Sequence, residues 1–296
     1  MMFGLRIPFH YAQCADCGSL WLTDPPKDFT TYYPADYYSF QKGRGVKAWF
    51  KTRLRAERDR AYFGRSNLFG EFLARRYKDA VLGSVSKLIE GQTARILDVG
   101  CGNGQLLCRM AMLGFQFLVG VDPLISEELN EGNGVRIRKC QLEDLKDEEY
   151  DLAMFHHSLE HIADPRNVLQ AAARLLAPDG RCLVRLPVVA HAWEKYGTNW
   201  VQLDPPRHMW VPTDKTMRIL AESVGLDVES VEYDSTEFQF WGSELYARGI
   251  PLKGVNSASL ERMFRREELI EFRNLAAYLN SKGQGDQAAF VLKKVH

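Results

Sequence analysis

The chain has 296 residues, of which 46% are hydrophobic and 26% charged, and its formal net charge is zero. This composition supplies a full globular core and excludes a disordered chain, and the zero net charge argues against a nucleic-acid-binding protein. No apolar run reaches the roughly 18 residues of a membrane span, and no secretory signal is evident. Six cysteines in a chain of this length are not a disulfide framework, so a reduced, cytoplasmic protein is expected.

The first segment, residues 1–42, is rich in turn residues and aromatics and contains the short run Cys14-Ala-Asp-Cys17-Gly18. Two cysteines at this spacing look like one zinc knuckle, but a structural zinc site needs four ligands. His10 could supply a third, and no fourth is evident. One interpretation of this segment is therefore a zinc site at Cys14 and Cys17. The other is a zinc-binding segment that is degenerate or truncated and has lost the remaining ligands.

Residues 43–90 carry apolar residues at helical spacing and predict a helical cap. Within them, Lys47 to Lys78 holds many more basic than acidic residues, with aromatics between them. One interpretation is peripheral contact with an anionic membrane surface or a phosphate-bearing acceptor. The alternative is a solvated helix face over an apolar cap, which the sequence favours.

Residues 91–296 alternate short apolar runs with helical stretches, as in a doubly wound sheet with helices on both faces. Strands are predicted at Ile96–Val99, Phe117–Val121, Val135–Lys139, Leu152–Phe155, Arg181–Leu186, Val228–Tyr233 and Ala288–Lys294. Helices are predicted at Gln105–Leu113, Pro165–Leu176 and Thr213–Ser223. Gly114, Gly180 and Gly225 each follow a helical pattern, where a left-handed cap is expected. A helical insertion at about 237–284 would separate the last two strands and could form a lid or a homodimer surface.

The most informative segment is Ile96–Gly104, an apolar strand that runs into a turn containing Gly100, Gly102 and Gly104. Such a turn lets a ligand lie against bare backbone at the start of a helix, where unpaired N–H groups favour anions. A second strand ends in Asp122, an acid placed to accept the hydroxyls of a ribose. The spacing differs from the G-x-G-x-x-G of dinucleotide folds, because Gln105 stands where that pattern needs a glycine.

This D-x-G-x-G-x-G pattern resembles motif I of class I methyltransferases, which use S-adenosylmethionine (SAM). The resemblance covers about residues 95–186 and includes the run from Tyr150 to Pro165 and the turn from Leu175 to Arg185. It implies a Rossmann-like, seven-stranded sheet that binds SAM, with the Cys-containing segment and the helical cap attached. The residues that it assigns to the cofactor are Asp98, Gly100, Cys101, Gly102, Asn103, Gly104, Asp122, Pro123, Leu142, Glu143, Phe155 and His156, and Asp144 is an alternative at the adenine. The cysteine pair resembles the N-terminal zinc ribbon of a bacterial subgroup.

Two histidine sites are candidates for the base that an acceptor hydroxyl would need. His161 lies in a Leu-Glu-His run after the fourth predicted strand, where it could instead cap or pack a helix. His208 lies in an Asp-Pro-Pro-Arg-His run with Asp204, and that run resembles a stretch of the same bacterial subgroup. Its alternative is a structural loop held by an Asp–Arg pair.

The sequence therefore predicts a SAM-dependent methyltransferase that acts on a small-molecule acceptor: a sugar, a quinone-like phenol or a lipid-linked intermediate. The Asn-Pro-Pro-Tyr type of loop used on nucleic-acid bases is absent, so no nucleic-acid partner is expected. Two alternatives remain at this point: a non-catalytic SAM-binding or scaffold protein, and an NAD-dependent oxidoreductase.

Overall fold

The core of the computed structural model, which describes residues 2, 4–32, 46–132, 134–146 and 148–295, is an eight-stranded sheet with the strand order β10-β11-β8-β7-β3-β4-β6-β5. Its strands are β3 (Arg95–Val99), β4 (Phe117–Val121), β5 (Leu129–Glu131), β6 (Val135–Arg138), β7 (Tyr150–His156), β8 (Leu176–Pro187), β10 (Leu226–Tyr233) and β11 (Gln287–Lys294). The seven predicted strands are confirmed, and a short antiparallel eighth, β5, was not predicted.

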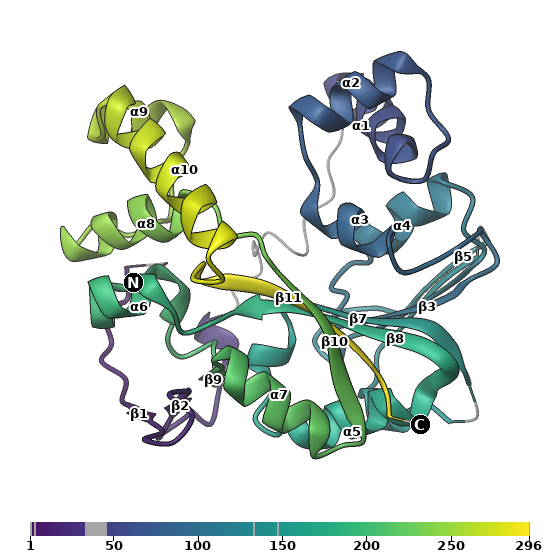
Figure 1. Cartoon of the computed structure of the whole chain (residues 1–296), viewed down its shortest axis with the longest axis horizontal. Helices are drawn as coiled ribbons and strands as arrows, with labels where there is room; N and C mark the ends of the chain where they lie inside the picture. The colour runs from purple at the N-terminus through teal and green to yellow at the C-terminus, as the bar shows by residue number, and fades with distance from the viewer. Residues whose placement is uncertain (1, 3, 33–45, 133, 147, 296) are drawn as a thin grey trace.

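The five strands from β6 through β4, β3 and β7 to β8 are parallel, whereas β11 runs antiparallel between β8 and β10. Helices α3 (Ala80–Val85) and α4 (Gln105–Met112) lie on one face of the sheet, and α5 (Pro165–Leu175) and α7 (Asp214–Glu222) lie on the other (Figure 1). This is the doubly wound arrangement that the sequence predicted. It brings the carboxyl ends of β3, β4 and β7 to a single edge, where polar side chains gather.

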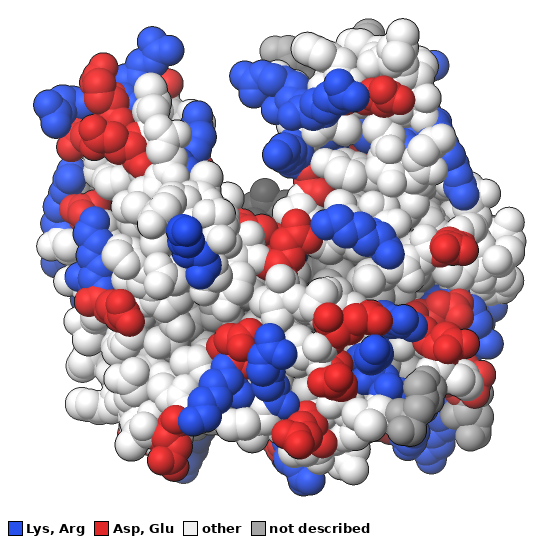
Figure 2. Space-filling view, in the orientation of Figure 1, with Lys and Arg blue, Asp and Glu red and all other residues white. Residues whose placement is uncertain are grey.

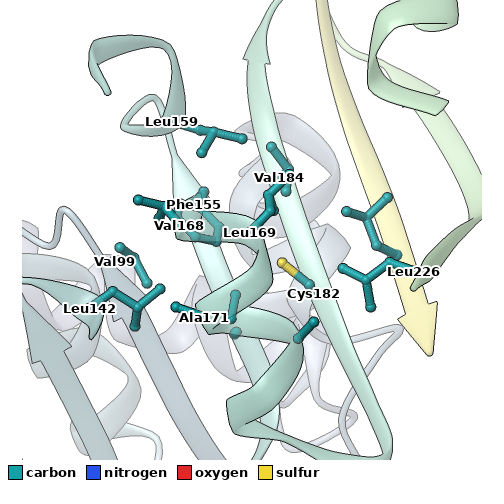
Figure 3. Packing of buried hydrophobic residues seen from close by; sticks show 14 of the residues in the cluster. Val99, Leu142, Phe155, Leu159, Val168, Leu169, Ala171, Cys182, Val184 and Leu226 are labelled. Carbon is teal, nitrogen blue, oxygen red and sulfur yellow. The ribbon is translucent and has the colours of Figure 1, made fainter. Parts of the chain in front are cut away.

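The side chains of β7 alternate between two hydrophobic clusters because successive residues of a strand point to opposite faces. Ala153 and Phe155 pack with α5, while Leu152 and Met154 pack with α4. Figure 3 shows Phe155 between Val168 and Leu169 of α5 and Val184 of β8. Both faces of the central strands are therefore buried, which is why the sequences of these strands are continuously apolar.

The ends of the helices confirm two of the three predicted glycine positions. Gly114 and Gly225 have left-handed φ values of 93° and 74° after α4 and α7. The prediction for Gly180 is wrong: α5 ends at Leu175, β8 begins at the next residue, and Gly180 lies inside β8. The pairing of β8 with β7 favours glycine at position 180 instead, because a Cβ there would lie 2.7 Å from the carbonyl oxygen of Tyr150.

The N-terminal segment forms a small second sheet from β1 (Tyr11–Gln13), β2 (Leu20–Leu22) and β9 (Trp210–Val211). Trp21 stacks on Trp210 at a ring-centroid distance of 5.4 Å, and the Tyr11 hydroxyl donates to the carbonyl oxygen of His208 at 2.6 Å. The cysteine-containing segment therefore supports the loop that carries His208. Helix α6 (His191–Tyr196) precedes this loop.

Two groups of helices project from the same side of the sheet (Figure 1). One is the predicted cap, α1 (Val46–Tyr62), α2 (Leu68–Arg76) and α3. The other is the predicted insertion between β10 and β11, which consists of α8 (Phe238–Ala247), α9 (Ser257–Met263) and α10 (Arg266–Ser281). Figure 2 shows a deep hollow between them. The domain limit predicted at residues 42/43 lies outside the described residues, and the limit near residue 90 stays a prediction.

A buried ion-pair network joins the cap to the sheet domain. The Arg109 side chain of α4 donates to Asp59 of α1 at 3.0 Å and to Asp79, which precedes α3, at 2.6 Å. Arg58 donates to the same two carboxylates at 2.7 and 2.9 Å. Only 2% of the Asp59 side chain is exposed, so water screens this network weakly.

We predict that Asp59→Ala lowers the free energy of unfolding by about 3 kcal/mol, because the change leaves buried guanidinium charge without one of its partners. Urea denaturation followed by circular dichroism measures the loss. The control is Arg218→Ala, which breaks the exposed Arg218–Asp214 pair and should cost less than about 1 kcal/mol. Equal effects of the two substitutions would show that the network does not stabilise the fold.

Candidate functional site

The turn between β3 and α4 has room only for glycine at its key positions. Gly100, Gly102 and Gly104 have φ values of 75°, 54° and 72°, in the left-handed region that disfavours side chains. A Cβ at Gly100 would lie 2.5 Å from Ser158 Cβ, and one at Gly104 would collide with Ile137. The first turn of α4 therefore presents bare backbone at the carboxyl edge of the sheet, as the sequence predicted.

Two buried carboxylates flank this turn. Asp122, at the end of β4, accepts hydrogen bonds from the backbone N–H of Gly102 at 2.9 Å and of Leu124 at 2.8 Å. Asp98, on β3, is 4% exposed. Burial, reinforced by the negative charge of Asp122, raises the pKa of Asp98 from 3.8 to about 7. Among the residues that the structure describes, burial and Asp122 dominate the charge state of Asp98, and two close acids suit a ligand that brings positive charge. SAM carries both an ammonium and a sulfonium group.

The residues predicted at the adenine lie in a 3-10 helix, Leu142–Asp144. Leu142 is buried, Glu143 accepts from the Asn167 side chain at 3.0 Å, and Asp144 accepts from the backbone N–H of Gln141 at 3.0 Å. Asp144 therefore caps its own helix. One carboxylate oxygen of Glu143 is buried without a hydrogen bond from any residue that the structure describes, which makes Glu143 the better candidate to contact a ligand.

The other predicted cofactor residues occupy different environments around the turn. Cys101 lies against Gly120, where burial raises the pKa of its thiol. Pro123 is exposed after Asp122, and Asn103 lies within the glycine turn. Phe155 is fully buried in the core below the end of β7. Both ring nitrogens of His156 are buried without a hydrogen-bond partner in the described part of the chain, and burial together with Arg185 lowers the pKa of His156 to about 3.

A second cluster forms where the loop after β7 meets the loop after α6. The ligand atoms of Glu160, His161 and His208 lie within 4.8 Å of one another, and the two imidazole rings are 4.9 Å apart. The cluster adjoins the glycine turn through Ser158, which packs on Gly100 and donates to the carbonyl oxygen of Val99 at 2.6 Å. The structure therefore brings together His161 and His208, which are 47 positions apart in the chain.

Backbone carbonyls orient both imidazoles. His161 Nδ1 lies 2.8 Å from the carbonyl oxygen of Arg207, and His208 Nδ1 lies 2.7 Å from that of Gln202. A carbonyl only accepts, so each Nδ1 carries the proton, and the lone pair of each neutral ring lies on Nε2. His208 Nε2 is 3.9 Å from both Glu160 Oε1 and Asp204 Oδ2.

The electrostatics of the cluster keep the carboxylate charged and the imidazoles neutral. Burial lowers the pKa of both His161 and His208 to about 4. Burial also opposes ionisation of Glu160, but the hydrogen bond from His157 at 3.3 Å and the adjacent His161 outweigh it, so the pKa of Glu160 is lowered to about 2. Within the described ranges, Glu160 Oε2 has no hydrogen-bond partner. The two neutral imidazoles and the carboxylate could accept a proton from a bound substrate. The same three side chains could also coordinate a divalent cation.

Asp204 lies in a constrained loop. Its φ is 40°, the Pro205–Pro206 bond is cis, and its carboxylate pairs with Arg207. The Asp–Arg pair that the sequence offered as a structural reading is therefore present, alongside the His208 contact. Glu160 is not among the site residues predicted from the sequence. Its position directly before His161 was the signal available in the sequence.

Cys14 and Cys17 face each other across the turn between β1 and β2. The backbone N–H of Gly18 donates to the carbonyl oxygen of Cys14 at 2.9 Å, and Cys17 Sγ lies 3.1 Å from Ser19 Oγ. Neither cysteine belongs to a cluster of three metal-ligating side chains among the residues that the structure describes. Zinc at this pair stays a prediction.

Comparisons with known proteins agree with this geometry. Residues 69–231, more than half of the chain, match the family model described as a methyltransferase domain. The ubiquinone biosynthesis O-methyltransferase of Xanthomonas axonopodis pv. citri is 40% identical over 108 residues, which are 33% of this chain and 44% of that protein. The enzyme of the same name from Neisseria meningitidis serogroup A is 33% identical over 97 residues, 29% of this chain and 41% of that protein.

These alignments span less than half the length of either curated relative. Among solved structures, the complex of the Haloferax volcanii Trm112 activator with a methyltransferase superposes with a TM-score of 0.50 at 15% identity. The match covers 85% of this chain and 98% of that one. At this identity the likeness shows the fold alone. None of these findings supports the oxidoreductase or scaffold alternatives. The chain therefore belongs to the methyltransferase-domain family and has the class I, SAM-dependent methyltransferase fold.

Proposed function

We propose that the chain transfers the methyl group of SAM to a hydroxyl oxygen of a small, quinone-like phenol. The observation that carries the proposal is the buried Glu160–His208 pair beside the glycine turn, because it supplies an oriented neutral base next to the expected methyl donor. The O-methyltransferase names of the partial relatives support an oxygen acceptor. Sugars and lipid-linked intermediates are the other acceptors to compare.

The residues expected to bind SAM divide by chemistry. Asp98 and the backbone of Gly100, Gly102 and Gly104 would hold its amino acid end, since Asp98 offers a buried carboxylate to the ammonium. Asp122 would accept from the ribose hydroxyls in exchange for its present bond from Gly102. Leu142 and Glu143 would border the adenine. Bound there, SAM supplies an electrophilic methyl group on a positively charged sulfur.

His208 would take the acceptor proton. Its Nε2 lone pair would accept the proton of the acceptor hydroxyl as that oxygen took the methyl group from the sulfur of SAM, so the positive charge would pass from sulfur to the His208 imidazolium. Glu160 stabilises that imidazolium, and the carbonyl of Gln202 holds the ring in place through Nδ1. Glu160 and Gln202 therefore position His208, and His161 lies beside it.

We predict that the unliganded protein loses stability as the pH rises from about 4 to about 7, because of Asp98. Its pKa is raised in the folded state, so the folded state holds this proton more tightly than the unfolded state within that window. In Asp98→Asn this dependence should disappear. The melting temperature of the variant relative to wild type should rise by about 5 °C or more across the window. A constant difference at all pH values would contradict the assignment.

We predict that Asp122→Ala weakens SAM binding at least tenfold, about 1.4 kcal/mol, because the ribose loses its acceptor and the carboxylate no longer accepts from Gly102 of the turn and from Leu124. Isothermal titration calorimetry with SAM, and with NADH as the competing dinucleotide, measures this. Asp227→Ala, at an exposed aspartate of β10, is the control and should leave the affinity unchanged. Binding of NADH without binding of SAM would refute the cofactor assignment.

We predict that His208→Ala lowers the turnover of a catechol acceptor by about 10²- to 10⁴-fold while SAM affinity stays within about twofold of wild type. His191→Ala, on α6, is the matched control. Activity should survive chelation of divalent metals, because the Arg207 guanidinium beside His208 disfavours a second cation there. Activity that is lost with a chelator and restored by zinc, manganese or magnesium would assign Glu160, His161 and His208 to a metal instead.

A further inference from the structure

Helix α2 turns its large apolar side chains outward. Leu68, Phe69 and Phe72 are 85%, 50% and 61% exposed, whereas Gly70 is buried against the carbonyl oxygen of Glu57 on α1. At 100° per residue, these three side chains cover one side of the helix, opposite Gly70. The solvated-face interpretation favoured by the sequence accounts for the exposed basic residues and leaves these exposed apolar side chains of α2 without an explanation.

Helix α1 and the residue after α2 carry two further exposed apolar side chains. Leu54 on α1 is 46% exposed, and Tyr77, which follows α2, is 56% exposed, with the Arg76 guanidinium 5.1 Å from the centre of its ring. Leu68, Phe69 and Phe72 lie together on one side of α2, and exposed apolar side chains grouped in this way mark an interaction surface more strongly than the same residues scattered singly. We call Leu54, Leu68, Phe69, Phe72 and Tyr77 the cap stripe.

The cap stripe is set in strong positive charge. From Arg53 to Lys78 the sequence has eight basic and three acidic residues, a formal charge of +5, although the whole chain is neutral. Arg55, Arg75, Arg76 and Lys78 are exposed. Figure 2 shows Lys and Arg side chains gathered over the α1–α2 pair beside the hollow. A second copy of this surface would meet like charge, which argues against a dimer through the cap.

We propose that the cap stripe docks on an anionic lipid bilayer. Leucine and phenylalanine side chains enter the boundary between headgroups and acyl chains, while arginines beside them pair with lipid phosphates. The ion pairs of Asp59 and Asp79 with Arg109 mount the cap on α4, so the docked surface stays attached to the sheet domain. Docking would place the hollow between the cap and the insertion next to the membrane. An acceptor with an apolar tail would then reach the enzyme from the bilayer. This last step rests on the proposed function.

Co-sedimentation with vesicles tests the docking without any acceptor. Wild-type protein should bind vesicles of phosphatidylcholine with one third phosphatidylglycerol, and should bind pure phosphatidylcholine far less. The triple variant Leu68→Ser/Phe69→Ser/Phe72→Ser should lose more than tenfold in partitioning. Arg75→Gln/Arg76→Gln should lose about fivefold for each charge removed, with the loss shrinking at high salt.

The matched control is Ile270→Ser/Tyr278→Ser, which removes similarly exposed apolar side chains from α10 and should bind as wild type does. Thermal melts and SAM titrations of all variants separate unfolding from loss of docking. Equal binding of wild type and the triple variant overturns the proposal, as does binding to heparin or to a second copy without binding to vesicles. Failure of methyl transfer with normal vesicle binding would refute the proposed function and leave the docking intact.

Discussion

The contact between the glycine turn and the loop after β7 is the constraint on which the site depends. Gly100 lies against Ser158, and the Ser158 hydroxyl ties that loop to the carbonyl oxygen of Val99 on β3. The same loop continues into Glu160 and His161. The expected cofactor turn and the expected base are therefore held in one short path of contacts, because parallel strands deliver their carboxyl ends to one edge. A side chain larger than glycine at position 100 would separate the two halves of the site.

Burial then decides the charge states at this edge. On one side of Ser158, burial and the nearby Asp122 raise the pKa of Asp98, and the two acids suit a ligand cation. On the other, burial makes His161 and His208 neutral while Glu160 stays ionised among them. These opposite outcomes suit a reaction that begins with positive charge on sulfur and ends with it on an imidazole. In the proposed reaction, Asp98 and Asp122 would bind the positive charge that SAM brings, and Glu160 would stabilise the positive charge that forms on His208.

What the sequence predicts well is local. The strand, turn and helix around Gly100 follow from adjacent residues, and seven strand positions follow from apolar runs. Gly180 was misread because a glycine after a helical pattern does not say whether the chain has already entered a strand. Local sequence does not predict the Glu160–His161–His208 cluster. Glu160 and His208 lie 48 positions apart, and only the tertiary fold shows that their loops meet. The exposure of Phe72 was hidden for the same reason, since periodicity gives a helix an apolar side without saying what covers it.

The cap and the cofactor turn share a helix. Helix α4 begins at Gly104 of the glycine turn, and its Arg109 holds both Asp59 of α1 and Asp79 before α3. The α1–α2 pair is therefore connected to α4 by buried ion pairs as well as by the chain itself. The two ends of α4 therefore serve different partners: its first turn faces the expected SAM site, and Arg109 near its last turn anchors the proposed membrane surface. Any acceptor delivered beside the cap would consequently meet a cofactor turn whose position is fixed relative to the bilayer.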